Sequence, residues 1–526
     1  MNPLFNIDFY KADHRRQYPE GTKIVYSNLT PRSTKWCEFI QNKEEKIVFA
    51  GLQGYIKRVL IDEWNENFFN KPKDEVVSEY RDMMVKCLGP SMEDCSHIEA
   101  LHDLGYLPIQ IDALPEGTKV SAGIPVLTIM NSKPEFFWLT NYLETSLSSE
   151  LWKTITCATI ANEYRSIMDK YAEKTCDNDE HVQFQCHDFS ARGMSGMQDA
   201  AQSGLGHLLS FKGTDTVAAI DYINKYYHGK RSPLVGASVP ATEHSVMCMG
   251  SKDGELETFR RLIQDTYPSG IVSIVSDTWD FWKVITEYAS ELKDVIESRD
   301  GKVVFRPDSG DPETIICGVA NMPLPIKNHG SHFSLDRRDI IGFNTPGFED
   351  SGEYKGALEC LWEVFGGTIN EKGYKVLNPK VGLIYGDSIT LERAESIMST
   401  MEHMGFASSN IVFGVGSFTY QMMTRDTLGF AVKATWGLIC ANGTAIFKDP
   451  ITDEGTKKSA KGLMVVNRDS SSGKLVLSDN LSAGEYSHMF SDGEMRPVYG
   501  PDAGEQDKKT HLRVDDTIEE IRERLQ

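Results

Sequence analysis

Several features of membrane and exported proteins are missing from this sequence. It has no window of about 18 uninterrupted apolar residues, so no membrane span is expected. The opening residues, MNPLFNIDFYKADHRR, include no apolar run that suits a signal peptide. The ten cysteines are scattered singly without a C-x-x-C pair, so neither a zinc ribbon nor a thioredoxin-type site is indicated. Free thiols without an export signal predict a cytoplasmic protein.

Positive charge is also scarce. The 55 Lys and Arg residues against 76 Asp and Glu give a formal net charge of -21, which we interpret as surface solvation. This balance argues against a nucleic-acid-binding protein, because phosphate contacts need a basic face. The sequence has no G-x-x-x-x-G-K-[ST], and GVGSFT is an incomplete G-x-G-x-x-G. The residues around Ser195 lack the spacing of a nucleophile elbow, so covalent catalysis is not indicated.

The chain does contain a regular alternation of short apolar runs and helical segments. The runs end at His187 and Asp188, at Asp215, at Glu243 and His244, at Ser276 and Asp277, at Arg306 and Asp308, at Asp387, and at Gly416 and Ser417. Most successive endings lie about 30 residues apart, which is the length of one strand-plus-helix unit. Six or seven such units predict an α/β barrel over residues 146–425, with its C-terminal strand ends converging on one mouth.

The segments on either side have a different composition. Residues 1–145 mix β-type runs at 23–30, 45–55, 107–114 and 117–131 with helical stretches such as 74–84, and residues 145–175 predict a long helix. Residues 426–526 return to β-type runs at 430–447, 462–469 and 474–479 and end in an amphipathic helix at 515–526. A stretch rich in Gly, Asn, Pro and His near 318–356 predicts an inserted excursion.

The predicted mouth collects an unusual set of side chains. Residues 302–312, KVVFRPDSGDP, leave a buried strand and at once present Arg306, Asp308, Ser309 and Asp311. One such loop is most simply a solvated turn, whereas seven polar strand ends that meet at one mouth favour a site. The candidate side chains there are His187, Asp188, Arg192, Asp215, Glu243, His244, Asp277, Arg306, Asp308, Asp387 and Arg425.

These residue types suit a phosphorylated sugar. The arginines, with Lys433 and Lys448 downstream, match phosphate oxygens. Gly386, Gly414 and Gly416 would let backbone N–H groups approach a phosphate or ribose. The carboxylates suit sugar hydroxyls or a hydrated Mg²⁺, which usually takes one or two carboxylates plus substrate phosphates. Pattern alone also allows an unrelated TIM-barrel lyase or hydrolase, although neither a Schiff-base lysine nor a carboxylate pair is clear.

Seven short motifs in one order resemble the nicotinamide phosphoribosyltransferase family. They are HDFSARG (187–193), FKGTDT (211–216), SVPATEHS (238–245), VSIVSD (272–277), RPDSGDP (306–312), TRD (424–426) and FKDP (447–450). The resemblance extends from YKADHRRQYP near the N-terminus to about Gly462. It implies the barrel of type II phosphoribosyltransferases, with a β-rich domain built from both ends of the chain. It also implies NAD salvage from nicotinamide and phosphoribosyl pyrophosphate by a homodimer with active sites at the subunit interface.

The resemblance also implies roles for individual residues. Nicotinamide would stack between Phe189 and Tyr10, the latter from the other subunit, and Asp215 would accept a hydrogen bond from its carboxamide. Other substrate contacts are expected from Arg192, Ser273, Gly386, Asp387, Ser417 and Arg425, and phosphate contacts from Arg32, Lys433 and Lys448. The catalytic candidates are His244, Asp277, Arg306 and Asp308, and Asp277 and Asp308 would hold Mg²⁺, through water.

His244 carries a further expectation. In the family the matching histidine is phosphorylated by ATP, so ATP is expected as a stimulating co-substrate, and Glu243 or Asp277 would orient the imidazole. Some positions depart from the family pattern: Ser417 and Phe418 stand where glycines are expected, and Ser190 and Ala191 where Gly and Tyr are usual. Two alternatives stay open: a nicotinate phosphoribosyltransferase, against which Asp215 argues, and a catalytically silent phosphosugar-binding regulator on the same scaffold.

Overall fold

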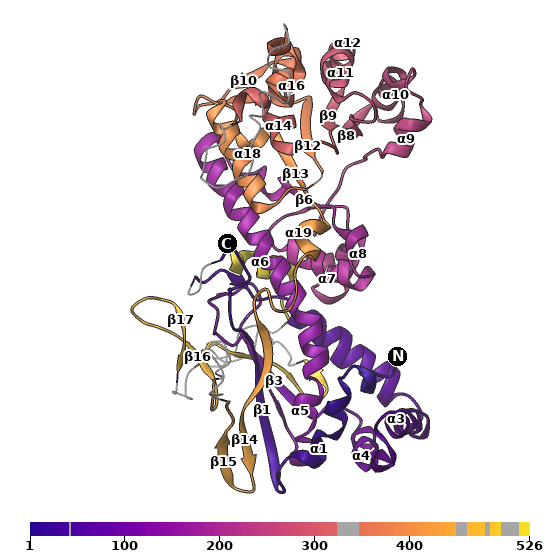
Figure 1. Cartoon of the computed structure of the whole chain (residues 1–526), viewed down its shortest axis with the longest axis vertical. Helices are drawn as coiled ribbons and strands as arrows, with labels where there is room; N and C mark the ends of the chain where they lie inside the picture. The colour runs from indigo at the N-terminus through magenta and orange to yellow at the C-terminus, as the bar shows by residue number, and fades with distance from the viewer. Residues whose placement is uncertain (41–43, 323–346, 387, 449–459, 479–483, 496–514) are drawn as a thin grey trace, which may run out of the picture.

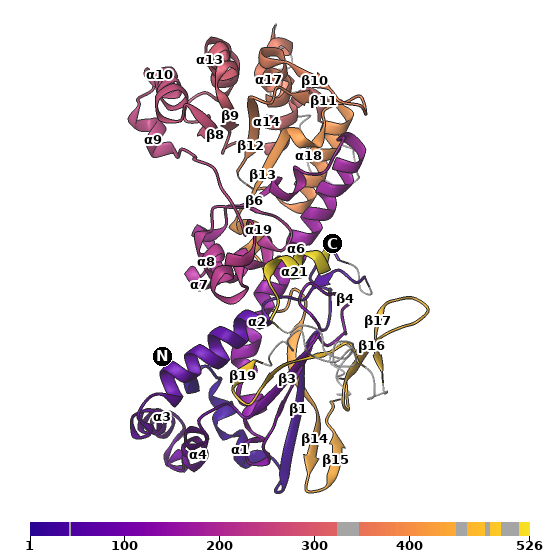
Figure 2. The ribbon, with the colours of Figure 1, turned by 180° about the vertical axis from the view of Figure 1, so that it is seen from behind.

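The chain builds two separate sheets, one in each of two lobes that are stacked along the long axis of the molecule (Figures 1 and 2). The computed structural model describes residues 1–40, 44–322, 347–386, 388–448, 460–478, 484–495 and 515–526. One sheet has seven strands in the order β15-β14-β1-β5-β3-β18-β19, and the other has six in the order β7-β6-β13-β12-β9-β8. The first is antiparallel and the second is parallel.

Both ends of the chain contribute to the antiparallel sheet. Its strands are β1 (Thr22–Pro31), β3 (Ile109–Ala113), β5 (Leu127–Asn131), β14 (Phe430–Ile439), β15 (Asn442–Ala445), β18 (Ser487–Ser491) and β19 (Glu494–Met495). β1 lies between β5 and β14, and Leu29 pairs with Val432 across 403 positions of sequence. The β-rich domain expected from the two ends of the chain is therefore confirmed.

Three expected β-type segments do not join this sheet, namely 45–55, 462–469 and 474–479. In residues 45–55 only β2 (Ile47–Val48) is a strand, paired with β4 (Lys119–Val120), and α2 (Leu52–Tyr55) follows at once. Gly51 has a φ of 97°, which turns the chain into that helix and which favours glycine. β16 (Val465–Arg468) and β17 (Leu475–Ser478) form their own two-stranded sheet.

The long helix α6 (Glu144–Thr175) connects the lobes (Figure 1). The sequence predicted this helix at residues 145–175. At 1.5 Å per residue it is about 48 Å long, enough to run past both cores. It packs against α7 (Met197–Leu208) and α18 (Leu391–His403) of the barrel and against β2 of the terminal lobe. The other helices of the terminal lobe are α1 (His14–Gln17), α3 (Lys73–Leu88), α4 (Ser96–Leu104) and α5 (Leu139–Tyr142).

The parallel sheet contains the predicted barrel strands. These are β6 (Cys186–Asp188), β7 (Gly213–Thr214), β8 (Ser269–Val275), β9 (Asp300–Arg306), β12 (Val381–Tyr385) and β13 (Ile411–Val415). The remaining predicted ending lies on residues 237–241, where Ala237 bridges to Gly213 of β7 and Ala241 bridges to Ser273 of β8. This short segment therefore connects the two edges of the curled sheet, so all seven strand ends face one mouth.

Helices follow most of these strands, as the rhythm predicted. They are α7 and α8 (Val217–Tyr226), α9 (His244–Met249), α10 (Glu255–Arg261), α11 (Phe281–Lys283), α12 (Ala289–Glu291), α13 (Lys293–Ser298), α14 (Pro312–Cys317), α16 (Gly352–Lys355), α17 (Ala357–Phe365), α18 and α19 (Ser417–Gln421). A hairpin of β10 (Gly367–Ile369) and β11 (Lys375–Leu377) lies between α17 and β12, where no strand pair was predicted. The apolar side chains between these helices and the sheet form one of the two large cores.

The predicted excursion leaves and rejoins the barrel at one point. Gly318 and Gly356 lie backbone to backbone, because a Cβ on Gly356 would stand 2.3 Å from the nitrogen of Gly318. Both have positive φ, 80° and 85°, so glycine is required at each for two reasons. Residues 323–346 of the excursion lie outside the described residues.

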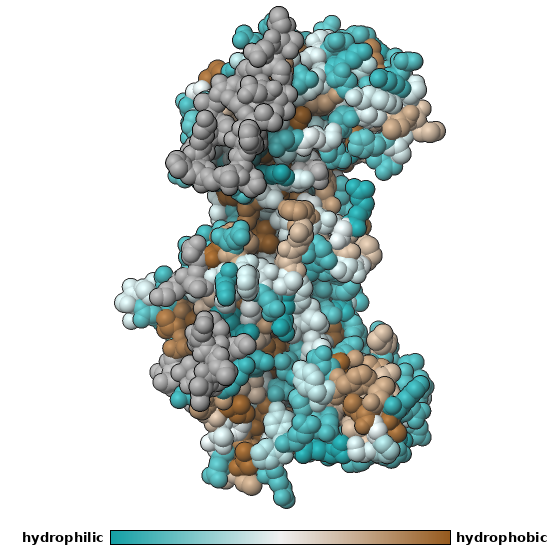
Figure 3. Space-filling model, viewed as in Figure 1, coloured by the Kyte–Doolittle hydropathy of each residue, from teal (hydrophilic) through white to brown (hydrophobic). Residues whose placement is uncertain are grey.

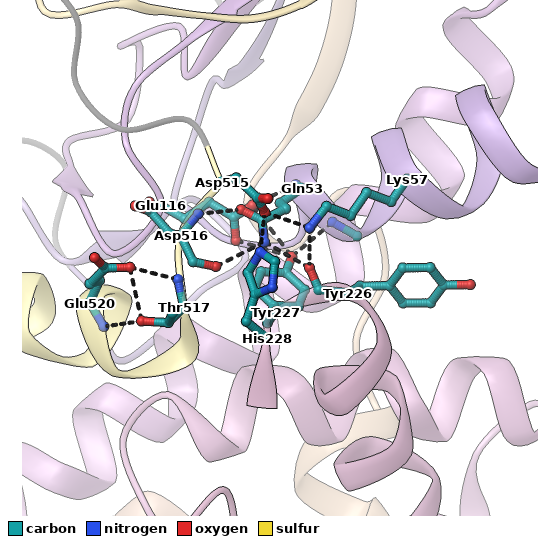
Figure 4. A network of polar contacts seen from close by, with 11 residues as sticks. Gln53, Lys57, Glu116, Tyr226, Tyr227, His228, Asp515, Asp516, Thr517 and Glu520 are labelled. Atoms are coloured by element: carbon teal, nitrogen blue, oxygen red, sulfur yellow. Dashed lines mark hydrogen bonds and ion pairs between the residues drawn. The ribbon is translucent and has the colours of Figure 1, made fainter. Parts of the chain in front are cut away.

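The C-terminal helix α21 (Ile518–Leu525) fastens the two lobes together (Figure 4). Thr517 and Glu520 form a capping box at its start, as the acidic beginning of this predicted helix favours. Just before it, the Gln53 side chain donates to the carbonyls of Tyr226 (2.7 Å) and Asp516 (2.9 Å). Asp515 accepts from Lys57 at 2.5 Å and lies 2.7 Å from Nε2 of His228. The residues before α21 thus link the helical segment that begins with α2 in the terminal lobe to the chain that leads into residues 237–241.

Apolar surface is spread over several places. On the face drawn in Figure 3, hydrophobic residues lie in separate patches among hydrophilic ones. In the part of the chain that the structure describes, no helix combines the length and the apolar character needed to span a membrane.

Candidate active site

A cavity of about 700 Å³ opens at the carboxyl ends of the parallel strands. Glu243 and Gly416 line it, and so do seven residues with a predicted catalytic or substrate-binding role, which are Phe189, Arg192, Asp215, Arg306, Asp308, Gly386 and Ser417. They follow β6, β7, β9, β12 and β13, so residues up to 228 positions apart meet because parallel strands end at one face. A cavity of this size suits a small cofactor or nucleotide-sized ligand.

Asp215 presents an ionised carboxylate to this cavity. Its Oδ1 accepts hydrogen bonds from Nε2 of His187 (2.9 Å) and from the Ser238 hydroxyl (2.5 Å). Burial alone would raise the pKa of Asp215, but the hydrogen bonds from His187 and Ser238 outweigh it and the pKa is lowered. From the sequence, His187 was a candidate without an assigned role, and Ser238 was not singled out. Both residues belong to motifs that carry the family resemblance, HDFSARG and SVPATEHS, so these motifs could have indicated them.

The Phe189 ring lies beside Gly414 of β13 and Gly386, which follows β12. A Cβ on Gly414 would stand 2.3 Å from Cδ2 of the Phe189 ring, and one on Gly386 would stand 3.4 Å from its Cε2. Gly414 therefore makes room for an aromatic wall. Gly386 lines the cavity, and a Cβ there would stand 2.9 Å from Oδ1 of Asp308, so its contact with the substrate stays a prediction. Gly416 has open space around its Cα and lines the cavity, so the original interpretation still suits that position.

Asp277 organises the loop after β9. Its Oδ2 accepts from the backbone N–H of Asp308 (2.9 Å) and from the Ser309 hydroxyl (2.6 Å), and its side chain is only 5% exposed. Its Oδ1 lies 3.4 Å from Nε2 of His244, while the neighbouring Glu243 accepts from the Ser245 hydroxyl instead. Of the two carboxylates considered for orienting His244, Asp277 is the one in position.

The loop RPDSGDP divides its polar residues between the cavity and the scaffold. Arg306 and Asp308 line the cavity, and Nη2 of Arg306 donates to the carbonyl of Thr242 at 3.1 Å. Asp311 caps α14 by accepting from the N–H of Thr314 at 3.1 Å. Asp188 likewise serves the scaffold: it is fully buried and accepts from the N–H and the hydroxyl of Ser190. The departure from the family pattern at Ser190 thus supplies a local hydrogen bond.

Of the two carboxylates predicted to hold Mg²⁺, one is available in the cavity. Asp308 lines the cavity, whereas Asp277 is engaged by protein donors and does not line it. Among the described residues no group of three or more His, Cys, Asp or Glu side chains could enclose a metal ion. A single carboxylate fits a Mg²⁺ ion that takes its other ligands from water and substrate phosphates.

Five predicted residues lie away from the cavity, on the terminal lobe or next to it. They are Tyr10, Arg32, Arg425, Lys433 and Lys448, which we call the basic cluster. Burial lowers the pKa of Lys433, and the nearby positive charges of Arg32, Lys11 and Lys448 lower it further. The Glu144 carboxylate, 4.0 Å from Nζ of Lys433, acts in the opposite direction and raises it. Tyr10 is 58% exposed and lies within electrostatic range of Arg425. None of the five lines the cavity of their own chain.

The remaining predicted residues have mixed positions. Ser417 begins α19 and its hydroxyl fills the space beside Gly193, while Phe418 is 57% exposed and lines the cavity. Ser273 is buried on β8 outside the cavity lining, and its hydroxyl has no hydrogen-bond partner among the described residues. Asp387 lies outside the described residues.

Comparison with known proteins gives matches along the whole chain. The model of the nicotinate phosphoribosyltransferase (NAPRTase) family matches residues 184–494, and that of the nicotinamide phosphoribosyltransferase N-terminal domain matches residues 2–111. A protein from Acinetobacter baylyi named nicotinamide phosphoribosyltransferase is 54% identical, over 100% of this chain and 97% of its own length. One of the same name from Mycoplasma pneumoniae is 36% identical over 88% of this chain and 95% of its own.

A solved structure has the same fold at low sequence identity. The nicotinate-nucleotide pyrophosphorylase from Pyrococcus furiosus superimposes with a TM-score of 0.52 at 13% identity, covering 100% of this chain and 95% of that one. The likeness supports the type II barrel architecture and carries no information on substrate choice.

Proposed function

The chain belongs to the nicotinamide phosphoribosyltransferase family, and we propose that it joins nicotinamide to phosphoribosyl pyrophosphate in NAD salvage. The products are nicotinamide mononucleotide and pyrophosphate. The observation that carries this assignment is the Asp215 carboxylate in the cavity wall, held ionised by two donors to its Oδ1. Its other oxygen can accept a hydrogen bond from a carboxamide NH₂, whereas the carboxylate of nicotinate would meet a like charge.

The reaction needs no base or nucleophile from the protein. The pyridine nitrogen attacks C1 of the ribose with its own lone pair, and the C1–O bond to pyrophosphate breaks with its electrons leaving on that group. Charge therefore grows on the departing pyrophosphate while the sugar becomes oxocarbenium-like. Arg192 and Arg306 line the cavity and would stabilise that charge in the transition state. Phe189 would hold the flat nicotinamide ring by stacking.

Magnesium would assist at the pyrophosphate. When bound, the metal would supply positive charge to offset the negative charge that grows on the leaving group. Asp308 is the carboxylate that would hold it, through water. Asp277 acts by fixing the backbone of Asp308 in place.

A second copy of the chain would complete the site. The basic cluster belongs to the same reaction by family resemblance but lies outside the cavity of its own chain, so we propose that each cavity receives it from a partner subunit. Large apolar side chains beside the cavity support a partner on this face, namely Met197 (65% exposed), Val217 (76%), Phe418 (57%) and Met422 (72%). Mixing an Asp215→Ala chain with a Lys433→Ala chain should restore part of the activity if sites are shared.

ATP would act through His244. We propose that His244 accepts the γ-phosphoryl group of ATP, with the P–O bond to ADP breaking as an N–P bond forms. Its imidazole is 47% exposed, and Asp277 stands behind it at 3.4 Å to orient the ring. Radiolabel from γ-labelled ATP should appear on the wild-type protein and not on a His244→Ala variant.

The ten cysteines are free thiols, which supports placement in the reducing cytoplasm.

One experiment tests the assignment. The purified protein is given Mg²⁺ and phosphoribosyl pyrophosphate with nicotinamide or with nicotinate, and mononucleotide and pyrophosphate are followed by chromatography. We expect product from nicotinamide in the wild type, and a shift toward nicotinate in Asp215→Asn because the amide can donate to a carboxylate. Product mainly from nicotinate in the wild type would move the protein to the nicotinate enzymes, and no product from either, with or without ATP, would indicate a silent binder.

A further inference from the structure

Two donors contact the same oxygen of Asp215. Nε2 of His187 lies 2.9 Å and the Ser238 hydroxyl 2.5 Å from Oδ1, and no described residue donates to Oδ2. The Asp215 side chain is 45% exposed, so Oδ2 is the oxygen that a ligand in the cavity can reach. These two side chains therefore determine which oxygen of Asp215 faces the cavity.

The His187 ring is itself held in place. His187 pairs with Gly213 in the register of β6 and β7, and a Cβ on Gly213 would stand 2.8 Å from Nδ1 of the ring. The ring also contacts Phe189, with centroids 4.8 Å apart. Its side chain is 12% exposed. The absence of a side chain at position 213 thus lets the imidazole reach Asp215 from a fixed direction.

The proton in this contact belongs to the imidazole. Asp215 is ionised and can only accept, so Nε2 of His187 must carry the hydrogen. We infer that His187 is a positioning residue for substrate choice: by donating to Oδ1, it aims Oδ2 of Asp215 at the carboxamide of nicotinamide. The inference rests on the proposed function and adds a residue to its specificity site.

The nearby Arg306 explains why the Asp215 carboxylate needs the hydrogen bond from His187. Its charge lies close enough to Asp215 to lower the pKa of that carboxyl. A carboxylate released from His187 is free to turn toward Arg306, and the pair would then neutralise each other. The carboxamide would lose its acceptor, and a nicotinate carboxylate would no longer meet an uncompensated negative charge. Loss of the His187 donor should therefore weaken nicotinamide and relax the discrimination against nicotinate.

The test compares His187→Leu with His187→Gln. Leucine removes the donor, whereas the side-chain amide of glutamine offers an N–H at a similar reach to Nε2. For His187→Leu we expect KM for nicotinamide to rise about tenfold to a hundredfold, as for loss of a hydrogen bond to a charged group. The ratio of kcat/KM for nicotinamide over nicotinate should fall by a similar factor, with KM for phosphoribosyl pyrophosphate within about threefold. His187→Gln should retain most of both quantities, and Ser238→Ala should show a smaller loss.

The outcomes separate this inference from the assignment on which it rests. A wild-type protein that does not use nicotinamide removes the assignment itself. If the wild type uses nicotinamide and His187→Leu keeps its KM and its preference, the positioning role is refuted. Equal losses in the leucine and glutamine variants, at unchanged melting temperature, would also refute it, because ring packing and not the donor would then be responsible.

Discussion

Replacing Gly414 by alanine tests how the aromatic wall of the cavity is packed. The new methyl group would stand 2.3 Å from Cδ2 and 2.5 Å from Cε2 of Phe189, and 2.7 Å from Cα of Gly386. Carbon atoms in contact prefer about 3.5–4.0 Å, so the ring must retreat by about 1 Å. Moving the ring does not relieve the contact with the Gly386 backbone, and β12 and β13 must separate as well.

Both effects can be measured. Overpacking of this kind costs about 1–3 kcal/mol, and the double contact places this variant near the upper end. A ring displaced from its position loses a stacking contribution of about 0.5–1.5 kcal/mol, so nicotinamide affinity should fall about twofold to tenfold. Urea denaturation measures the first quantity and titration calorimetry with nicotinamide the second. Gly416→Ala is the matched stability control, because nothing lies within 4 Å of its new Cβ and its φ is −93°.

A second substitution identifies the cause. Adding Phe189→Leu to Gly414→Ala shortens the group that the methyl strikes, so the double variant should recover part of the lost stability although it lacks the stacking ring. Wild-type stability and wild-type nicotinamide affinity in Gly414→Ala would refute the packing argument. So would a double variant in which the two losses simply add.

Three further predictions concern the scaffold. Burial raises the pKa of Glu116 to about 7, although hydrogen bonds from the backbone of Gln53 and Gly51 act to lower it. Because this pKa lies above the unfolded value of about 4.5, the free energy of unfolding should fall by about 3 kcal/mol as the pH rises from about 4.5 to about 7. Denaturation curves of Glu116→Gln should show a weaker dependence of stability on pH. Asp277→Asn should lower ATP-stimulated kcat about tenfold, because Asp277 contacts His244 and the Asp308 loop. KM for nicotinamide should stay within about threefold, since Asp277 does not line the cavity. An unchanged kcat in steady-state assays would contradict its orienting role. Arg522 is 6% exposed and donates to the carbonyls of Leu208, Leu234 and Val235. Arg522→Leu should therefore lower the free energy of unfolding by about 3 kcal/mol, measured by thermal or urea unfolding. The matched control is Glu523→Ala at an exposed position of the same helix, which should lower it by about 0.5 kcal/mol or less.

The errors of the sequence-based interpretation are of one kind. The run at residues 45–55 has strand-type composition in both halves, yet Gly51 starts a helix because its φ allows a turn that composition does not reveal. Gly414 was assigned to a phosphate contact because glycines after strands often have that role, whereas here its neighbour is the Phe189 ring. In each case the deciding contact involves atoms that local pattern does not specify.

The sequence by itself determined the architecture and the charged residues that line the cavity. Repeated strand-plus-helix units require a parallel sheet, and parallel strands end at one face, so Asp215, Arg306 and Ser417 had to converge whatever the details of packing. Only the tertiary structure decided which polar groups face a ligand and which hold the others. His187 and Ser238 fix one oxygen of Asp215 across 28 and 23 positions, and Asp277 fixes Asp308 from the neighbouring strand. Such pairings depend on distances between side chains of different strands, which no spacing along the chain encodes.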